Sequence, residues 1–261
     1  MKTSIKKLII TLLAASFVCT VGGCTSGSTN VTESTVESTS SDSSESSNTE
    51  TVNSDEAGID DFDYDLSEDE SSYSIRNGYD GEIVNVMEGE GASVYNIPSE
   101  YNGLPVTEVS FDAFRMHNNV KEVIIPDSVV EVGSSAFALC ENLEKIEFGK
   151  NVAVIGTDVC LSNTSLAELV LDCKVTEIPT AAFAGCESLK TVTLGDSVTT
   201  IGQSAFQLCF SLEEFHVTES LTSIYDDDSV FSGCENLTIY APAGSYAETY
   251  AKEKGINFVA E

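Results

Sequence analysis

One apolar position recurs along this chain at a nearly constant spacing, and no other sequence feature constrains the fold as strongly. Its successive members lie 23, 23, 23, 23 and 25 residues apart. They are Phe114, Phe137, Cys160, Phe183, Phe206 and Phe231. A second series follows each of them by six residues: Val120, Leu143, Leu166, Leu189, Leu212 and Leu237. A unit of this length cannot bury its own apolar face, so the units must stack and share one elongated core.

Two apolar pairs within each unit predict its local structure. The first pair alternates, as in Ile146 and Phe148, which places both side chains on one face of a strand. The second pair is spaced by three, as in Val152 and Ile155, and Gly156 follows it where the chain must turn, so a short second strand or tight bend is favoured over a helix. The segment that carries the recurring Phe is long enough for one helical or 3₁₀ turn. We therefore expect a repeat solenoid, mainly β, with short parallel strands and short helical or 3₁₀ turns.

The unit resembles the repeats of the BspA-like leucine-rich repeat family of bacterial surface proteins. The matching residues in one unit are Ala136, Phe137, Cys140, Leu143, Ile146, Phe148, Val152, Ile155 and Gly156. The resemblance covers about residues 94 to 240 and implies a leucine-rich-repeat-like stack of parallel strands. It also implies a role in adhesion to host extracellular proteins or to other cells. One unit departs from the pattern, because Cys160 takes the Phe slot and Asn163 the Cys slot, and we expect a locally thinner core there.

The two ends of the solenoid are expected to be capped. Residues 241–261 form the predicted C-terminal cap, in which Ser245 and Glu248 are spaced as a capping box and Gly255 suits the position after the last helical residue. Residues 73–110 are predicted to form an irregular, hairpin-like N-terminal cap and a partial first turn, and residues 111–240 the repeats.

The first 23 residues have the features of an export signal. Basic residues precede an apolar run from Leu8 to Val21, and small residues then lead to Cys24. This ending resembles the lipobox of bacterial lipoproteins, which implies that Cys24 is acylated and that two acyl chains anchor the protein to the bacterial membrane. The alternatives are an ordinary cleaved signal peptide and an uncleaved anchor, although the apolar run is short for a transmembrane helix.

Residues 24–72 are predicted to form a disordered acidic tether rich in Ser and Thr. No Lys or Arg occurs from residue 8 to residue 75, so the segment should repel itself and extend. The acidic run from Asp60 to Asp65 does not match the spacing of an EF-hand loop, because Leu66 stands where Gly is needed, and it is interpreted as solvated linker.

The charge balance excludes several classes of partner. The chain has 12 basic and 43 acidic residues and a net charge of −31. Nucleic acid and an anionic membrane surface are therefore disfavoured partners, and attachment to the membrane is assigned to the N-terminal lipid. The acidic balance is compatible with basic partners, but we prefer the interpretation that it forms a solvated exterior.

No cofactor, metal site or catalytic residue is predicted. Four cysteines share one repeat slot, namely Cys140, Cys186, Cys209 and Cys234, and a repeated slot indicates a packing position with free thiols. The two histidines, His117 and His216, have no triad context, and the acids Asp226–Asp228 are interpreted as a surface insertion. Phosphate-loop, dinucleotide and nucleophile-elbow motifs do not occur. A pair of glycosidase carboxylates is an alternative, because acidic residues are plentiful, but no sequence feature singles out such a pair. We expect that the chain is not an enzyme.

What remains is the surface of the predicted strands. Their outward residues form the predicted binding face: Glu122, Ile124, Lys145, Glu147, Glu168, Val170, Thr191, Thr193, Glu214 and His216. This mixed face is compatible with protein recognition and also with an idle solvated sheet. We therefore predict a monomeric, lipid-anchored cell-surface module that binds a protein ligand, such as a host extracellular matrix protein or another cell-surface protein. The alternative is a structural or accessory envelope component that scaffolds a membrane-associated complex.

Overall fold

The computed structural model of this chain describes residues 62–76 and 93–261. All of these residues belong to the compact unit Thr49–Glu261. The predicted signal peptide, Cys24 and the tether as far as residue 61 lie outside the described residues. In the part of the chain that is described, no helix has the length and apolar character needed to cross a membrane.

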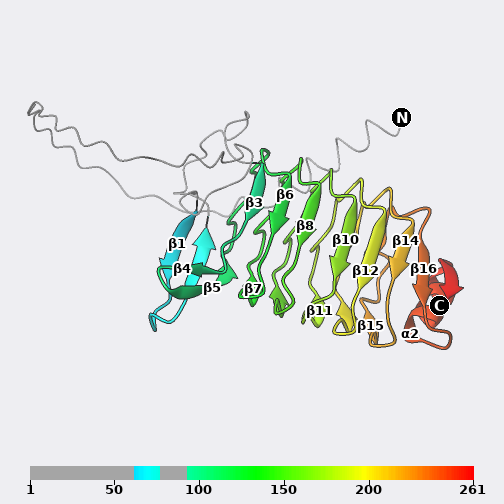
Figure 1. Cartoon of the computed structure of the whole chain (residues 1–261). Coiled ribbons are helices and arrows are strands. Elements are labelled where there is room, and N and C mark those ends of the chain that lie inside the picture. The colour runs from blue at the N-terminus through cyan, green and yellow to red at the C-terminus, as the bar shows by residue number, and fades with distance from the viewer. Residues whose placement is uncertain (1–61, 77–92) are drawn as a thin grey trace, which may run out of the picture. The chain divides into compact units, whose positions relative to one another are not determined.

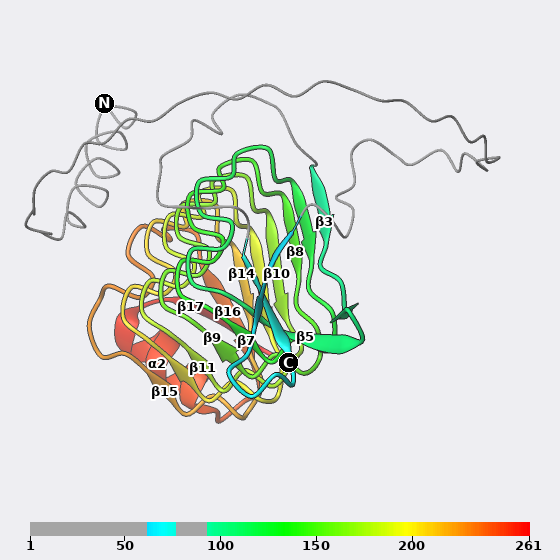
Figure 2. The same cartoon turned by 90° about the vertical axis from the view of Figure 1, so that its left-hand side faces the viewer.

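Each coil of the solenoid contributes one strand to each of two layers, with a turn segment between them (Figures 1 and 2). The front layer consists of β3 (Val94–Asn96), β6 (Glu122–Ile124), β8 (Lys145–Glu147), β10 (Glu168–Leu171), β12 (Thr191–Leu194), β14 (Glu214–His216), β16 (Thr238–Ala241) and β17 (Asn257–Ala260). The back layer continues through β5 (Leu104–Val109), β7 (Glu131–Val132), β9 (Val154–Ile155), β11 (Glu177–Ile178), β13 (Thr200–Ile201) and β15 (Ser223–Ile224). Paired strands of successive coils are parallel, and residues 23 positions apart lie side by side, as Leu169 does with Val192. The predicted repeat solenoid is confirmed.

The core follows the periodicity of the sequence. The alternating and three-spaced apolar residues are buried between the layers, apart from Phe148, which is half-buried. Rings in the recurring slot stack from coil to coil, with centroid distances of 5.1 Å from Phe114 to Phe137 and 5.7 Å from Phe183 to Phe206. Cys160 interrupts this column of rings and is itself fully buried.

The turn segments, which we call the turn layer, do not contain a continuous helical turn. Two residues four positions apart are left-handed there, with φ of 56° at Ser135 and 62° at Leu139. Isolated bonds join N–H to the carbonyl three residues back, as from Ala138 to Ser135 at 3.0 Å. The N–H of Phe137 instead donates to Val159 of the next coil at 2.9 Å. The turn layer is therefore a stack of short turns linked between coils.

The repeated Cys slot satisfies backbone carbonyls of this turn layer. Each thiol donates to the carbonyl of the recurring-slot residue in the preceding coil, as Cys186 does to Cys160 and Cys209 to Phe183, both at 3.3 Å. All six cysteines of the described residues carry free thiols. Burial raises the pKa of Cys140 and of Cys186 to about 12, which favours the neutral thiol that can donate.

The glycines after the second apolar pair serve close packing between coils. A Cβ on Gly156 would lie 2.2 Å from the backbone nitrogen of Ser134, and one on Gly133 would lie 2.6 Å from that of Phe111. Neither glycine has a positive φ. The chain turns directly after each glycine, as expected, and the adjacent backbone leaves no room for a side chain at either position.

The N-terminal cap begins earlier than the sequence indicated. β1 (Asp63–Leu66) and β2 (Tyr73–Arg76) form an antiparallel hairpin, and β2 continues the back layer beside β5. β4 (Glu100–Tyr101) pairs with β5 in the antiparallel sense. Phe62 is buried, 6.4 Å from the ring of Phe114. The prediction that residues 62–72 belong to the tether is therefore wrong. Aromatic side chains among these acidic residues pack on the first coil instead.

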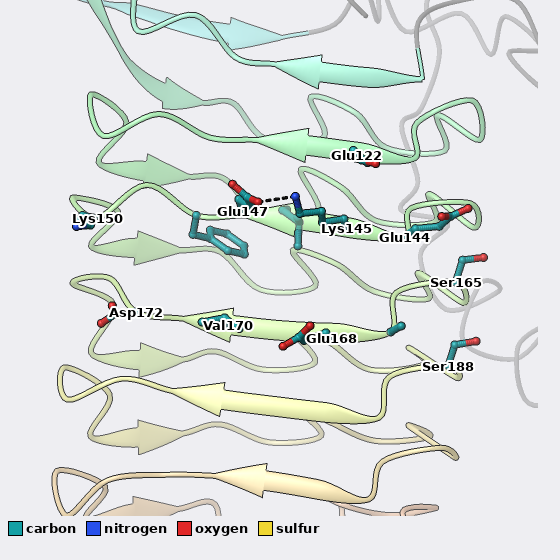
Figure 3. Close-up of a pocket in the computed structure, with 13 residues that line it drawn as sticks. Glu122, Glu144, Lys145, Glu147, Lys150, Ser165, Glu168, Val170, Asp172 and Ser188 are labelled. Atoms are coloured by element: carbon teal, nitrogen blue, oxygen red, sulfur yellow. Dashed lines mark ion pairs between the residues drawn. The ribbon is translucent and has the colours of Figure 1, made fainter. Parts of the chain in front are cut away.

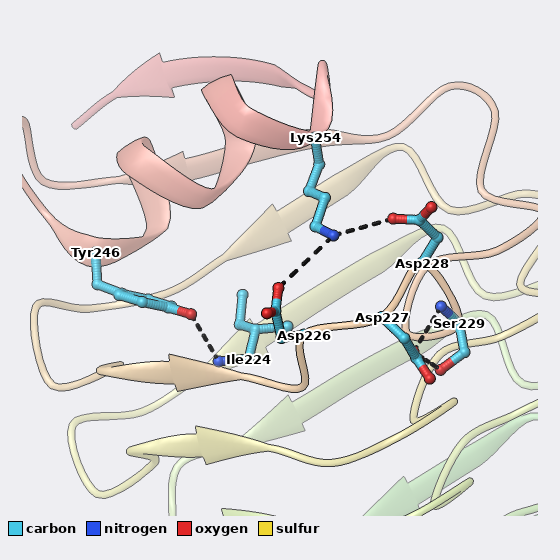
Figure 4. Close-up of polar contacts among 7 residues, drawn as sticks. All are labelled: Ile224, Asp226, Asp227, Asp228, Ser229, Tyr246 and Lys254. Carbon is cyan, nitrogen blue, oxygen red and sulfur yellow. Dashed lines mark hydrogen bonds and ion pairs between the residues drawn. The ribbon is translucent and has the colours of Figure 1, made fainter.

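The C-terminal cap agrees with its prediction. Helix α2 (Tyr246–Lys254) begins after Ser245, whose hydroxyl accepts the N–H of Glu248 at 3.2 Å, and it ends at Gly255 with φ of 69°. β17 then adds a last parallel strand beside β16. Lys254 pairs with Asp228 at 3.0 Å, and the Tyr246 hydroxyl accepts the N–H of Ile224 at 3.1 Å (Figure 4). The helix is thereby joined to the insertion and to the last back-layer strand.

Candidate functional site

The ten residues of the predicted binding face all lie on strands of the front layer. Their neighbours in each strand are buried, so alternation turns these side chains away from the core. Val170 is the most exposed apolar residue among them, with 45% of its surface accessible. The ten side chains therefore point outward from the front layer, and their role in binding is a prediction.

The front layer is divided into two sheets. One consists of β3, β6 and β8, and the other of β10, β12, β14, β16 and β17. Among the residues described, no backbone ladder joins β8 to β10. Figure 3 shows the wider spacing between these two strands than between their neighbours. The back layer divides at the same coil, between β9 and β11.

Pro179 accounts for a missing bond in the back layer. At the equivalent position of other coils, the N–H of Gly156 donates to Val132 at 2.8 Å and that of Gly202 donates to Ile178 at 2.7 Å. Proline has no N–H, so Pro179 cannot donate to the carbonyl of Ile155. The turn layer remains continuous here, since the N–H of Cys160 donates to Ala182 at 2.8 Å. The coils therefore separate at their strands but not at their turns.

A groove with a volume of about 1000 Å³ occupies the division of the front layer. We call it the β8–β10 groove (Figure 3). Its lining consists of Glu122, Glu144, Lys145, Ile146, Glu147, Phe148, Lys150, Ser165, Ala167, Glu168, Val170, Asp172 and Ser188. Its apolar lining residues are Ile146, Phe148, Ala167 and Val170. Charged side chains from both strands, including Lys145, Glu147 and Glu168, lie beside them (Figure 3). The groove combines apolar contact area with directional polar groups, as ligand sites do.

The groove is predominantly acidic. Five of its lining residues are acidic and two are lysines. Lys145 pairs with Glu147 on its own strand at 2.5 Å, instead of with Glu168, the residue 23 positions further on. The hydrogen bond and charge of Glu147 raise the pKa of Lys145, and the charge of Glu122 adds to this shift. One of the two cations is therefore neutralised locally, while Glu168 faces the groove from the opposite strand.

The structure brings together only part of the predicted face. Five of its residues line the groove: Glu122, Lys145, Glu147, Glu168 and Val170. Ile124, Thr191, Thr193 and Glu214 lie on the front layer outside the lining. His216 is engaged at the C-terminal edge, where its ring stacks on Tyr240 at 4.5 Å and lies 3.3 Å from the Glu261 carboxylate. The strands therefore present two different environments, a groove and a contacted edge.

Sequence reasoning missed several lining residues. Glu144, Lys150 and Asp172 flank the strands and were outside the alternation that defined the predicted face. Phe148 was predicted to point inward, and it is half-buried at the groove instead. The departure from the repeat at Cys160 and Asn163 lies in a coil that borders the groove, but it predicted only a locally thinner core there.

Other chemistry-bearing residues do not assemble into a site of this kind. In residues 62–76 and 93–261, no group of three or more His, Cys, Asp or Glu is placed to hold a metal ion. His117 is buried, and its Nδ1 lies 3.1 Å from the carbonyl of Arg115. Asp227 hydrogen-bonds Ser229, which lowers the pKa of Asp227. These contacts serve the local structure.

Comparison with known proteins identifies the class. The model of the BspA type leucine rich repeat region matches residues 107–238 in six copies, and this chain therefore belongs to the BspA-type leucine-rich repeat family. That family is a repeat scaffold, and leucine-rich repeat solenoids in general bind proteins. No curated protein matches the chain.

Two solved structures are similar in fold. A leucine-rich repeat protein of T. pallidum is 26% identical with a TM-score of 0.59, and the match covers 79% of this chain and all of that one. A leucine-rich cell surface protein of Faecalibacterium prausnitzii is 24% identical with a TM-score of 0.53. That match covers 71% of this chain and 54% of the F. prausnitzii protein, so this chain spans about half its length.

Proposed function

We propose that this chain is a lipid-anchored cell-surface module that binds a protein ligand through its front layer and has no enzymatic activity. The observation that carries the proposal is the β8–β10 groove, which lies on the face predicted from alternation alone. Loss of one ladder there exposes apolar and charged side chains together. Such a mixture is typical of protein-binding surfaces.

Attachment to the surface is supported by the N-terminal sequence. The basic residues, apolar run and Cys24 occur in the order of a lipoprotein signal. Acylation of Cys24 would anchor the chain, and the acidic segment after it would hold the solenoid away from the membrane. The F. prausnitzii relative is described as a cell surface protein, which agrees with this placement.

Adhesion to a host or cell-surface protein is the form of binding that we favour. The experiment uses the chain from Thr25 onward, which contains the whole compact unit without the proposed signal and lipid. Its binding to immobilised matrix proteins, glycans and envelope extracts is compared with that of Val170→Asp. In this variant a charged side chain replaces apolar contact with the bound ligand, and we expect binding to weaken by about tenfold or more.

Val154→Asp is the matched control. Val154 is 49% exposed, close to the 45% of Val170, but it lies on β9 in the back layer. Equal binding by both variants and the parent would contradict the proposal. Capture of a bacterial membrane complex, lost in Val170→Asp, would instead assign the same face to an envelope scaffold.

A further inference from the structure

We infer that the β8–β10 groove docks an extended, positively charged segment of the partner protein, with Glu168 as the anchor for a Lys or Arg side chain. This inference rests on the proposed function and specifies the chemistry of its ligand. It follows from three properties of the groove. These are its charge, the apolar surface of Val170 and Phe148, which we call the apolar shelf, and its unpaired strand edges.

Charge is the first property. The lining holds five acidic residues against two lysines, and Lys145 is taken up by Glu147 on the same strand. Glu168 is exposed on β10, on the other side of the division. In the part of the chain that the structure describes, Glu168 forms no ion pair with Lys145, the lysine that the 23-residue register would place beside it. A cation from a partner would therefore meet a carboxylate without displacing a lysine of this chain.

The apolar shelf is the second property. Val170 follows Glu168 by two residues, so both side chains leave the same face of β10. Phe148 lies at the opposite side of the groove and is half-buried. Long basic side chains place their methylene stems on apolar surface and their charged ends at carboxylates. The arrangement of Val170, Phe148 and Glu168 fits that kind of side chain.

Unpaired strand edges are the third property. Since no ladder joins β8 to β10, the backbone groups that face the division are not engaged with each other. Such groups favour ligands that carry their own donors and acceptors at regular spacing, as an extended peptide does.

Charge also argues against two occupants of the groove that this chain could supply, namely the segment before the fold and a second copy. The segment that precedes the fold has no Lys or Arg from residue 8 to residue 75. A second copy carries the same net charge of −31 and would be repelled. The groove therefore fits a different protein with a basic segment.

The test measures binding of labelled peptides to the chain from Thr25 onward, by fluorescence anisotropy at low salt. The probes are peptides of equal length in which valine alternates with arginine, with serine or with glutamate. We expect the arginine peptide to bind, and Glu168→Lys to weaken its binding by about tenfold through like-charge repulsion.

Glu177→Lys is the control for Glu168→Lys. Glu177 belongs to the same coil and is exposed, but it lies on β11 in the back layer. The substitution changes the net charge of the chain by the same amount. Glu177→Lys should therefore leave the affinity for the arginine peptide within about twofold, because only a long-range screened effect remains.

Three results would overturn the inference. Equal weakening by Glu168→Lys and Glu177→Lys would show attraction to net charge alone. Preference for the glutamate or serine peptide would show the wrong ligand chemistry, and so would failure of all three peptides to bind. The proposed function has its own readout in Val170→Asp and Val154→Asp against whole proteins, so it can stand when this inference fails.

Discussion

The coil around Phe183 and the coil around Cys160 have the same length but differ in how they join their neighbours. The ring of Phe183 stacks on Phe206, and Cys186 donates its thiol to the preceding coil. In the other coil a small thiol replaces the ring, and Asn163 replaces the donor thiol with an acceptor for the N–H of Cys140 at 3.0 Å. Both strand layers divide between the strands of this coil and those of the preceding coil, while its turn layer remains paired on both sides.

This difference shows that a repeat can lose part of its pattern without losing its register. Strands, rings and turns link neighbouring coils in separate ways, and interruption of some links leaves others to hold the stack. The place where the strand links are missing is also the place of the groove. In this solenoid the departure from the repeat therefore coincides with the candidate site.

The largest expected difference is between the two ring slots. Phe206 contacts Phe183, Phe215 and Phe231, with centroids 5.1 to 5.9 Å away. Phe206→Ala should therefore cost about 3 to 5 kcal/mol of unfolding free energy, whereas Cys160→Ala should cost about 1 kcal/mol because far fewer buried atoms are removed. Urea unfolding followed by circular dichroism measures both. Equal losses of unfolding free energy in the two variants would contradict the expected difference between the two ring slots.

The second largest expected effect is a loss of folding stability at alkaline pH, caused by the buried thiols. Burial raises the pKa of Cys186 from 9.0 to about 12, so the folded state keeps a proton that the unfolded state releases. The stabilisation is fully present below about pH 9 and falls as pH rises toward 12, by about 1.4 kcal/mol per pH unit for each such thiol. Urea midpoints between pH 8 and 11 should fall, and more gently in Cys186→Ala. An unchanged slope in that variant would contradict the assignment.

Removal of the Asn163 amide should have an intermediate effect. Asn163 is fully buried, and its Oδ1 is the acceptor for the N–H of Cys140. Asn163→Ala leaves that N–H without its acceptor and should cost about 1 to 3 kcal/mol. Thermal unfolding of Asn163→Ala and of Asn163→Cys, which restores the residue type of the regular coils, measures the effect. If the alanine variant were as stable as the parent, Asn163 would not hold this coil.

The smallest expected effect is at Pro179. Pro179→Gly supplies an N–H at the position that donates in the other coils. A new bond to the carbonyl of Ile155 and the lost rigidity should offset each other to within about 1 kcal/mol. Hydrogen exchange should nevertheless show protection of the new amide. The amide of Gly202, which donates to Ile178 at 2.7 Å, provides the reference level. Exchange at the rate of an unstructured chain would mean that Pro179 does not cause the division of the back layer.

Much of this fold is predictable from particular residues. The spacing of Phe114, Phe137 and Phe183 predicted that these residues share one elongated core, and the capping residues Ser245 and Gly255 predicted α2. Strand alternation placed Glu168 and Val170 on the outward face. These features depend on nearest neighbours along the chain and on one repeated distance.

Other features depended on contacts that no local pattern encodes. Phe62 belongs to an acidic segment, and only its packing against Phe114 makes it part of the cap. The left-handed residues Ser135 and Leu139 are not types that demand positive φ, and bonds between coils hold them there. Neither could be assigned from propensity.

The sequence by itself determined the repeat, the buried slots and the outward face, because a period of two in a strand and 23 residues in a coil fix which way each side chain points. The tertiary structure alone decided where the front layer opens and that Lys145 pairs with Glu147 rather than with Glu168. The reason is that bonds between coils form only when two whole coils fit together, and this fit is the sum of contacts at rings, thiols, glycines and Pro179.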